Sequence, residues 1–345
     1  GRLEGQRSNP NYSNEYKRHI LERLVAAEGL ERYLHSRYVG QKRFSGEGNE
    51  SLIPLLDGLI QRAGASGVQQ IVMGMAHRAR LNVLVNTLGK MPADLFREFE
   101  GTQPSDLPSG DVKYHQGYSS AIQTQGSVVR LALAFNPSHL EIVNPVVEGS
   151  ARARQHILKD LVGDKVMPVL IHGDAALAGQ GIVYEVIQMM SLEGYNTGGS
   201  VHLVINNQIG FTTDFEDARS STYCTGVASV VSAPVFHVNG DDPETVVMAM
   251  KLALEYRMEF RKDVVLDIVC FRKLGHNEQD TPMLTQPLMY SKIAQHPGTR
   301  KLYADKLAAQ GLGATLGDDM AKAYRAALDE GRHTVDPVLT NFKSQ

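Results

Sequence analysis

The sequence of 345 residues contains only two cysteines and no long apolar run. Cys224 and Cys270 are too few for the disulfide framework of small secreted proteins, so we expect a reducing compartment. No apolar run reaches the roughly 18 to 20 residues of a membrane span, and no signal-peptide pattern opens the chain. We therefore expect a soluble intracellular protein, cytoplasmic in a bacterium, which we favour, or in the mitochondrial matrix of a eukaryote.

The sequence also lacks an excess of charge of either sign. It has 35 basic and 38 acidic residues, so neither a nucleic acid nor a membrane surface is implied as a partner. No G-x-G-x-x-G follows the first predicted strand, which argues against a generic nucleotide-binding Rossmann domain. With 42% hydrophobic residues, the chain can bury a core of one large or two small domains.

Residues 166–211 have the pattern of a strand, a helix and a second strand. The apolar runs at 166–171 and 200–205 are the strands, and apolar residues recur at helical spacing over 182–192. A connection of this length is a right-handed crossover, which makes the two strands parallel. The residues that end them, Asp174 and Asn207, should therefore meet at one edge of the sheet.

That edge is where open parallel sheets hold ligands. Asp174, Asn207 and a backbone carbonyl after Asn207 would supply hard oxygen atoms, which suit Mg²⁺ together with water and phosphate. Gly179-Gln180-Gly181 would let the backbone at the start of the next helix approach a diphosphate. The alternative is structural, with Asp174 as a helix cap and the asparagines as turn residues.

Other segments predict a fold of alternating helices and strands. The predicted helices span 14–38, 51–62, 141–159, a long segment after Asp242 and 299–331, and the predicted strands span 68–73, 127–135, 234–238 and 264–271.

At Asp174 and Asn207 the sequence resembles the thiamine diphosphate enzymes, whose cofactor signature begins Gly-Asp and ends in Asn. From about Tyr38 to Tyr303 it resembles the dehydrogenase component of the 2-oxoglutarate dehydrogenase complex. The strings that carry this resemblance are MGMAHRARLNVLVNTLGK, GDVKYHQGYSS, NPSHLEIVNPVVEGSARARQ, HGDAALAGQG, INNQIGFTT, HVNGDDPE and LGHNEQDTPMLTQPLMY.

The resemblance implies an α/β fold, mostly parallel with helices on both faces, of the transketolase-like diphosphate-binding type. It implies a helical segment over 1–65, the diphosphate-binding domain over 66–298, and a helical linker over 299–345 towards a pyrimidine-binding domain that these residues lack. In that family the motifs lie in the middle of a protein more than twice this length. We therefore expect a piece that cannot complete a turnover alone.

The implied activity is oxidative decarboxylation of 2-oxoglutarate in the tricarboxylic acid cycle, with thiamine diphosphate and Mg²⁺ as cofactors. The succinyl group would pass to the lipoyl group of a succinyltransferase partner, and a homodimer would complete the cofactor site. The related 2-oxoadipate dehydrogenase and a noncatalytic thiamine diphosphate-binding module are the alternatives.

The resemblance also assigns roles to individual residues. His77 and His115 would be catalytic and would bind substrate together with Ser119 and Ser138. The residues assigned to the cofactor are Arg78, Leu140, Asp174, Ala175, Ala176, Asn207 and Ile209. Asp174, Asn207 and the Ile209 carbonyl would hold the metal.

Residue patterns alone leave several of these roles open. His77 at a predicted helix start could be a structural cap, Leu140 an ordinary core residue, and 40–44 a solvated basic loop. His276 is as consistent with a structural role as with a place beside the site.

Three residues depart from the family pattern. Gly46 stands where relatives usually have Leu, Ala79 where they usually have Gly, and Gly226 where Asp is common. An added methyl at Ala79 could shift His77 and Arg78 if the backbone there approaches a ligand closely.

Overall fold

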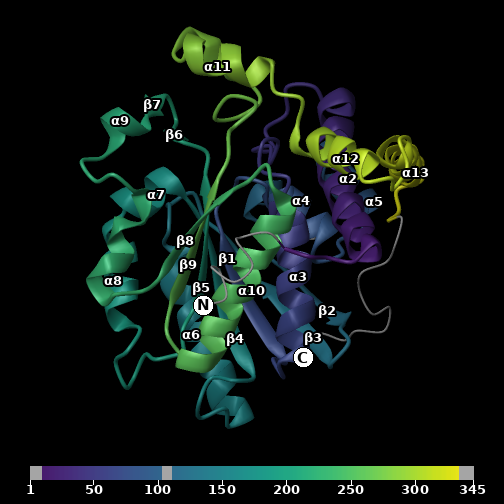
Figure 1. Cartoon of the computed structure of the whole chain (residues 1–345). Helices are drawn as coiled ribbons and strands as arrows, with labels where there is room; N and C mark the ends of the chain where they lie inside the picture. Colours follow the sequence, from purple (N-terminus) through teal and green to yellow (C-terminus); the bar gives the residue numbers. More distant parts are fainter. Residues whose placement is uncertain (1–9, 103–110, 334–345) are drawn as a thin grey trace.

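The computed structural model describes residues 10–102 and 111–333, and its centre is a seven-stranded sheet (Figure 1). The strand order is β2-β3-β1-β4-β5-β9-β8, with β2 antiparallel to β3 and the other neighbours parallel. The predicted α/β fold with a mostly parallel sheet is confirmed. The strands are β1 (Gln70–Met75), β2 (Tyr118–Gln123), β3 (Val128–Leu133), β4 (Val166–Gly173), β5 (Val201–Asn206), β8 (Val235–Asn239) and β9 (Val264–Val269), and a small hairpin joins β6 (Ile209–Gly210) to β7 (Thr213–Asp214).

Helices cover both faces of the sheet, which explains why the central strands are apolar almost throughout. Ile71 and Met73 of β1 face the larger core, which includes α3 and α10, whereas Val72 faces α6 on the opposite side. The α-helices are α2 (Asn14–Arg37), α3 (Leu52–Ala65), α4 (Arg80–Asn86), α5 (Pro92–Glu100), α6 (Val143–Leu158), α7 (Asp174–Gly179), α8 (Gly181–Met189), α9 (Phe215–Ala218), α10 (Pro243–Phe260), α11 (Pro287–Ala294), α12 (Thr299–Ala309) and α13 (Leu316–Asp329). Three short 3₁₀ helices, η1 (Lys113–His115), η2 (Cys224–Val231) and η3 (Pro282–Leu284), complete the helical elements of the described ranges.

The predicted strand, helix, strand unit is present with one difference. β4 and β5 are parallel neighbours, as expected. The helix begins at once after β4 as α7, is interrupted at Gln180, and resumes as α8. The interruption falls within the Gly179-Gln180-Gly181 stretch, where the two glycines lower the helix propensity.

The terminal helices pack against the same core as the sheet. α12 and α13 lie beside α2 (Figure 1), and Tyr303, Leu307 and Leu328 belong to the core cluster that contains Ile20 and Leu24. The predicted division of the chain into a helical segment (1–65), a diphosphate-binding domain (66–298) and a linker (299–345) stays a prediction.

The chain reverses its direction of travel across the sheet at β1 and β4. After β1 the chain continues to β2 and β3 on one side, and after β4 it continues to β5 on the other. Such a switch point leaves a crevice outside the carboxyl ends of the two strands, where open α/β sheets bind ligands. The turn beginning at Ala76 and the start of α7 at Asp174 border this crevice.

Both cysteines are buried and free, as expected. Within the described ranges, no helix is long and apolar enough to cross a membrane.

Candidate active site at the carboxyl edge of the sheet

His77 follows β1 and lies in a cluster of rings. Its imidazole stacks on His115, with centroids 5.0 Å apart, and on Phe44 at 5.1 Å, while Tyr114 meets it edge-on. Its buried Nε2 has no hydrogen-bond partner among the described residues. Burial, followed by the charges of His115 and Arg80, lowers the pKa of His77 to about 4. His77 is therefore a neutral, desolvated imidazole with one nitrogen available, and it caps no helix.

His115 lies in η1 and connects His77 to Ser138. Its Nε2 is 3.3 Å from the Ser138 hydroxyl, and its Nδ1 is 2.9 Å from an Asp111 carboxylate oxygen. Three of the four predicted substrate residues are thus neighbours. The fourth, Ser119, is in β2, paired with Ala132, and the described structure records no hydrogen bond from it to His115. The role of Ser119 towards substrate stays a prediction.

Arg78 lies beside His77 and is partly buried between two loops. Its guanidinium donates to the carbonyl of Ser45 at 3.3 Å and to that of His276 at 2.7 Å, and it lies over the ring of Phe44. Burial, followed by repulsion from Arg272, lowers the pKa of Arg78 to about 10, so it stays a cation at neutral pH. His276 packs against Phe44 and Phe211, and its backbone carbonyl anchors Arg78, which puts it beside the site.

Asp174 is the first residue of α7 and is 3% exposed. Burial raises the pKa of its carboxyl to about 6, against the hydrogen bonds that it accepts from its own backbone N–H and that of Ala175. The negative charge of Asp267 raises this pKa further. An acid held in this way gains from any cation that replaces the lost water.

Asn207 and Ile209 follow β5 on either side of a backbone kink. Gln208 between them has a φ of +67°, a left-handed conformation that is unusual for a residue other than glycine. The Ile209 N–H donates to the Asn207 side-chain oxygen at 3.4 Å. A Cβ added to Gly210 would lie 2.7 Å from that of Ala175, so this loop touches the start of α7. The predicted metal residues thus lie at the start of α7 and in the loop after β5, which are in contact.

Unpartnered oxygen atoms gather around this edge. The buried side-chain oxygens of Asn206 (Oδ1), Asp214 (Oδ1) and Asp267 (Oδ1) have no hydrogen-bond partner in the described structure. Carboxylate and amide oxygens are the ligand atoms that a divalent cation such as Mg²⁺ prefers. No group of three or more His, Cys, Asp or Glu side chains in the described ranges could hold a metal. The predicted ligand set has one carboxylate, one amide and one carbonyl, so it would not form such a group.

The remaining predicted cofactor residues border the same crevice. Leu140 follows β3 and lines a small cavity with Ala76 and Ile171, the residues at the ends of β1 and β4. It is 42% exposed, so it is not an ordinary core residue. Ala176 is in the first turn of α7 and partly exposed.

Two of the departures from the family pattern are coupled. Ala79 has a φ of +62°, which favours glycine, and a Cβ added to Gly46 would lie 2.8 Å from the Ala79 Cβ. The methyl of Ala79 therefore occupies space that the missing side chain of residue 46 leaves free. Loss of volume at one position accommodates the gain at the other.

The chain belongs to the dehydrogenase E1 component family, whose model matches residues 22–336. It is 68% identical, over its whole length, to the 2-oxoglutarate dehydrogenase E1 component of Cupriavidus necator. Identity to the proteins of the same name is 58% over 98% of the chain in Azotobacter vinelandii and 52% over 94% in Coxiella burnetii. The chain spans only 36%, 36% and 35% of these relatives, about a third of their length.

Stability should depend on pH through His77. An unfolded imidazole has a pKa of about 6.5, so as pH falls the unfolded chain takes up a proton before folded His77, whose pKa is about 4. Folding free energy is therefore lost from about pH 7 down to about pH 4. We expect urea unfolding of His77→Gln to lose less stability between pH 7.5 and 5 than the unchanged protein, with exposed His156→Gln as the matched control. An equal loss in both variants would contradict the assignment.

Gly46→Ala should destabilise the protein, and Ala79→Gly should rescue it. The added methyl meets the Ala79 Cβ, and overpacking of this kind costs about 1 to 3 kcal/mol. In the double variant that methyl is gone, so the two changes should not be additive in urea unfolding. Gly149→Ala is the control, because nothing lies within 4 Å of a Cβ added there. Additive free energies would show that the two positions are independent.

Proposed function

We propose that the protein containing this chain decarboxylates 2-oxoglutarate oxidatively with thiamine diphosphate and transfers the succinyl group to the lipoyl group of a succinyltransferase. The observation that carries the proposal is the meeting of two sets of residues at one switch point. His77 follows β1, Ser138 follows β3 and His115 precedes β2. Asp174 begins α7 directly after β4. The names of the relatives support the same substrate.

Thiamine diphosphate, when bound, supplies the electron sink that loss of CO₂ from a 2-oxo acid requires. Asp174, Asn207 and the Ile209 carbonyl would hold Mg²⁺ on its diphosphate. Ala175 and Ala176 leave room beside that group, and Leu140 would contact the cofactor. Arg78, a partly buried cation that donates to two backbone carbonyls, would lie on the cofactor side. Its positive charge would favour the negatively charged diphosphate there.

His77 and His115 would orient the substrate dianion, with the Ser138 hydroxyl as a further donor. The pKa of His77 is lowered to about 4 by burial, so the imidazole is neutral at pH 7. An arriving carboxylate favours the charged form, so His77 can take up a proton as substrate binds. A group that changes protonation in this way is suited to proton transfer during the reaction.

A homodimer that completes the cofactor site and a bacterial cytoplasmic location belong to this proposal. Cupriavidus, Azotobacter and Coxiella are bacteria, and the names of the relatives describe a component of a larger complex. The full-length protein is therefore the proper object of functional tests.

Metal-dependent cofactor binding should depend on Asp174. We expect calorimetric titration of thiamine diphosphate into the full-length protein to show binding with Mg²⁺ and none with EDTA. Asp174→Ala should abolish the binding because it removes the one carboxylate of the ligand set. Asp305→Ala, on the exposed surface of α12, is the matched control. Undiminished binding by Asp174→Ala would overturn the assigned clamp.

The substrate should be 2-oxoglutarate in preference to 2-oxoadipate. One methylene is worth about 1 to 3 kcal/mol in a fitted site, so we expect kcat/KM to differ by about 10-fold to 200-fold. Turnover of the two acids by the full-length protein, followed as CO₂ release in parallel, measures the ratio. An equal or higher kcat/KM for 2-oxoadipate would favour the alternative that the protein is a 2-oxoadipate dehydrogenase. No turnover of either acid would favour a noncatalytic module.

A further inference from the structure

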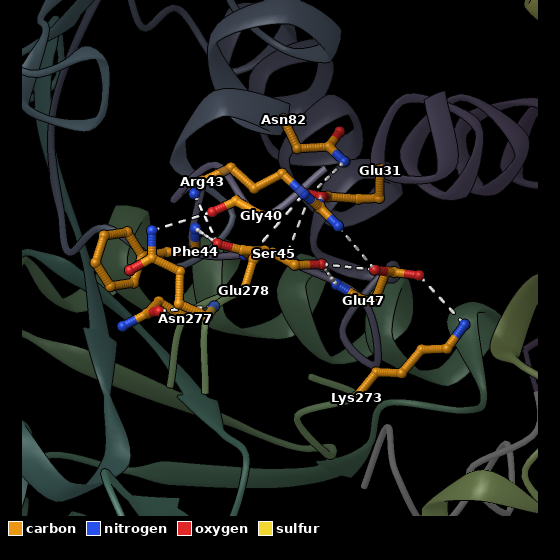
Figure 2. Close-up of polar contacts among 12 residues, drawn as sticks. Glu31, Gly40, Arg43, Phe44, Ser45, Glu47, Asn82, Lys273, Asn277 and Glu278 are labelled. Carbon is orange, nitrogen blue, oxygen red and sulfur yellow. Dashed lines mark hydrogen bonds and ion pairs between the residues drawn. The ribbon is translucent and has the colours of Figure 1, made fainter. Parts of the chain in front are cut away.

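The carboxylate of Glu278 binds the backbone of the loop that carries Phe44. Figure 2 shows its carboxylate facing three successive residues of that loop. It accepts hydrogen bonds from the backbone N–H groups of Arg43 at 2.7 Å, Phe44 at 3.2 Å and Ser45 at 2.8 Å. A carboxylate that satisfies three consecutive buried N–H groups fixes the backbone at that point.

Phe44 is held in an unfavourable conformation by these contacts. Its φ is +50°, a left-handed conformation that is unfavourable for a residue with a Cβ atom. Its N–H donates to Glu278, and its carbonyl accepts from the Ala79 N–H at 3.0 Å. Both backbone polar groups of Phe44 are therefore tied, one to the segment after β9 and one to the turn after His77.

The ring of Phe44 contacts three other rings of the site, those of His77, Tyr114 and His276. It stacks on His77 at 5.1 Å and meets Tyr114 at 4.8 Å and His276 at 5.5 Å, both edge-on. Arg78 lies over its face. The ring covers one side of His77, and so contributes to the desolvation that keeps this imidazole neutral.

A buried cluster of ion pairs around Arg43 also holds the same loop. Arg43 is 2% exposed and pairs with Glu31, with Glu47 at 3.3 Å and with Glu278 at 3.9 Å. Glu31 also accepts a hydrogen bond from the Gly46 N–H at 3.0 Å. Removal of one partner from such a cluster leaves a buried charge unpaired, which is strongly destabilising locally.

Further bonds join the two segments on either side of Glu278. The Gln279 amide donates to the Gly40 carbonyl at 3.1 Å, and Lys273 donates to Glu47 through its backbone N–H and, at 3.2 Å, through its ammonium group. Residues 40–48 and 271–279, more than 200 positions apart, thus form one clasp over the site, and Glu278 is its centre.

We propose that Glu278 is a positioning residue of the active site, which holds Phe44 against His77 and so sets the substrate-binding face of that imidazole. The role rests on the proposed function, because it assumes that His77 meets the substrate. The Glu278 carboxylate binds the backbone of residues 43–45 and pairs with Arg43, so its effect on His77 passes through the loop that holds Phe44.

Hydrogen exchange followed by mass spectrometry on the full-length protein tests directly whether Glu278 holds the backbone of residues 43–45. In Glu278→Gln we expect peptides covering 40–48 to exchange at least tenfold faster, because the neutral amide has one acceptor oxygen in place of two charged ones. Asp280→Asn is the matched control, since Asp280 accepts only the Asn277 N–H within its own segment. Unchanged exchange at 40–48 in Glu278→Gln would overturn the proposal.

Steady-state kinetics on the same variants test the consequence for the site. We expect Glu278→Gln to raise KM for 2-oxoglutarate about tenfold with kcat changed less than threefold, and Asp280→Asn to change neither. Faster exchange with unchanged KM would contradict a positioning role. If the unchanged protein does not turn over 2-oxoglutarate, the proposed function fails while the exchange result still decides whether Glu278 holds the loop.

Phe44→Leu covers the case in which Glu278→Gln does not fold. This variant removes the ring but leaves every backbone hydrogen bond of the clasp available. We expect it to keep the slow exchange of residues 40–48 and to raise KM as Glu278→Gln does. An unchanged KM in Phe44→Leu would overturn the proposal, because the ring would then not set the face of His77.

Discussion

Parallel pairing of β4 with β1 on one side and with β5 on the other is the constraint on which the site depends. It brings three strand ends to one edge, and the reversal of chain direction between β1 and β4 leaves a crevice there. His77, Asp174 and Asn207 occupy the first turns beyond those ends. A register shift at β4 would move Asp174 away from both neighbours at once.

Charged and polar groups at this edge are held at an energetic cost that ligands can offset. Burial lowers the pKa of His77 to about 4 and raises that of Asp174 to about 6. The two shifts have opposite directions but one cause, because burial removes water from the charged form of each group. Phe44, Ala79 and Gln208 have positive φ values in the loops that border the crevice. Groups fixed in advance need little rearrangement when an oppositely charged ligand arrives, which is the usual physical basis of preorganised sites.

Local sequence pattern was sufficient for the parts of the site that follow directly from strand ends. Apolar runs and the crossover rule predicted that β4 and β5 are neighbours, and hence that Asp174 and the loop of Asn207 lie together. The family motifs predicted the His77, His115 and Ser138 group, which the structure brings together. Its roles in binding and catalysis stay predictions.

Contacts between distant segments could not be predicted in this way. The hydrogen bonds from residues 43–45 to Glu278 join positions more than 230 residues apart. Nothing in the local sequence around Glu278 predicts which backbone N–H groups its carboxylate binds. The stacking of Phe44 on His77 and the compensation between Gly46 and Ala79 depend equally on three-dimensional packing. Ser119 is four residues from His115 in sequence but lies in β2, and the described structure records no hydrogen bond between them.

Locating the metal tests the central claim most directly, namely that the loops after β4 and β5 form one cation site beside the imidazole pair. Crystals of the full-length protein with thiamine diphosphate and Mn²⁺ in place of Mg²⁺ would give an anomalous scattering peak at the metal. We expect that peak between the Asp174 carboxylate, the Asn207 side-chain oxygen and the Ile209 carbonyl, with His77 facing the same crevice. A peak ligated by other residues would contradict the account.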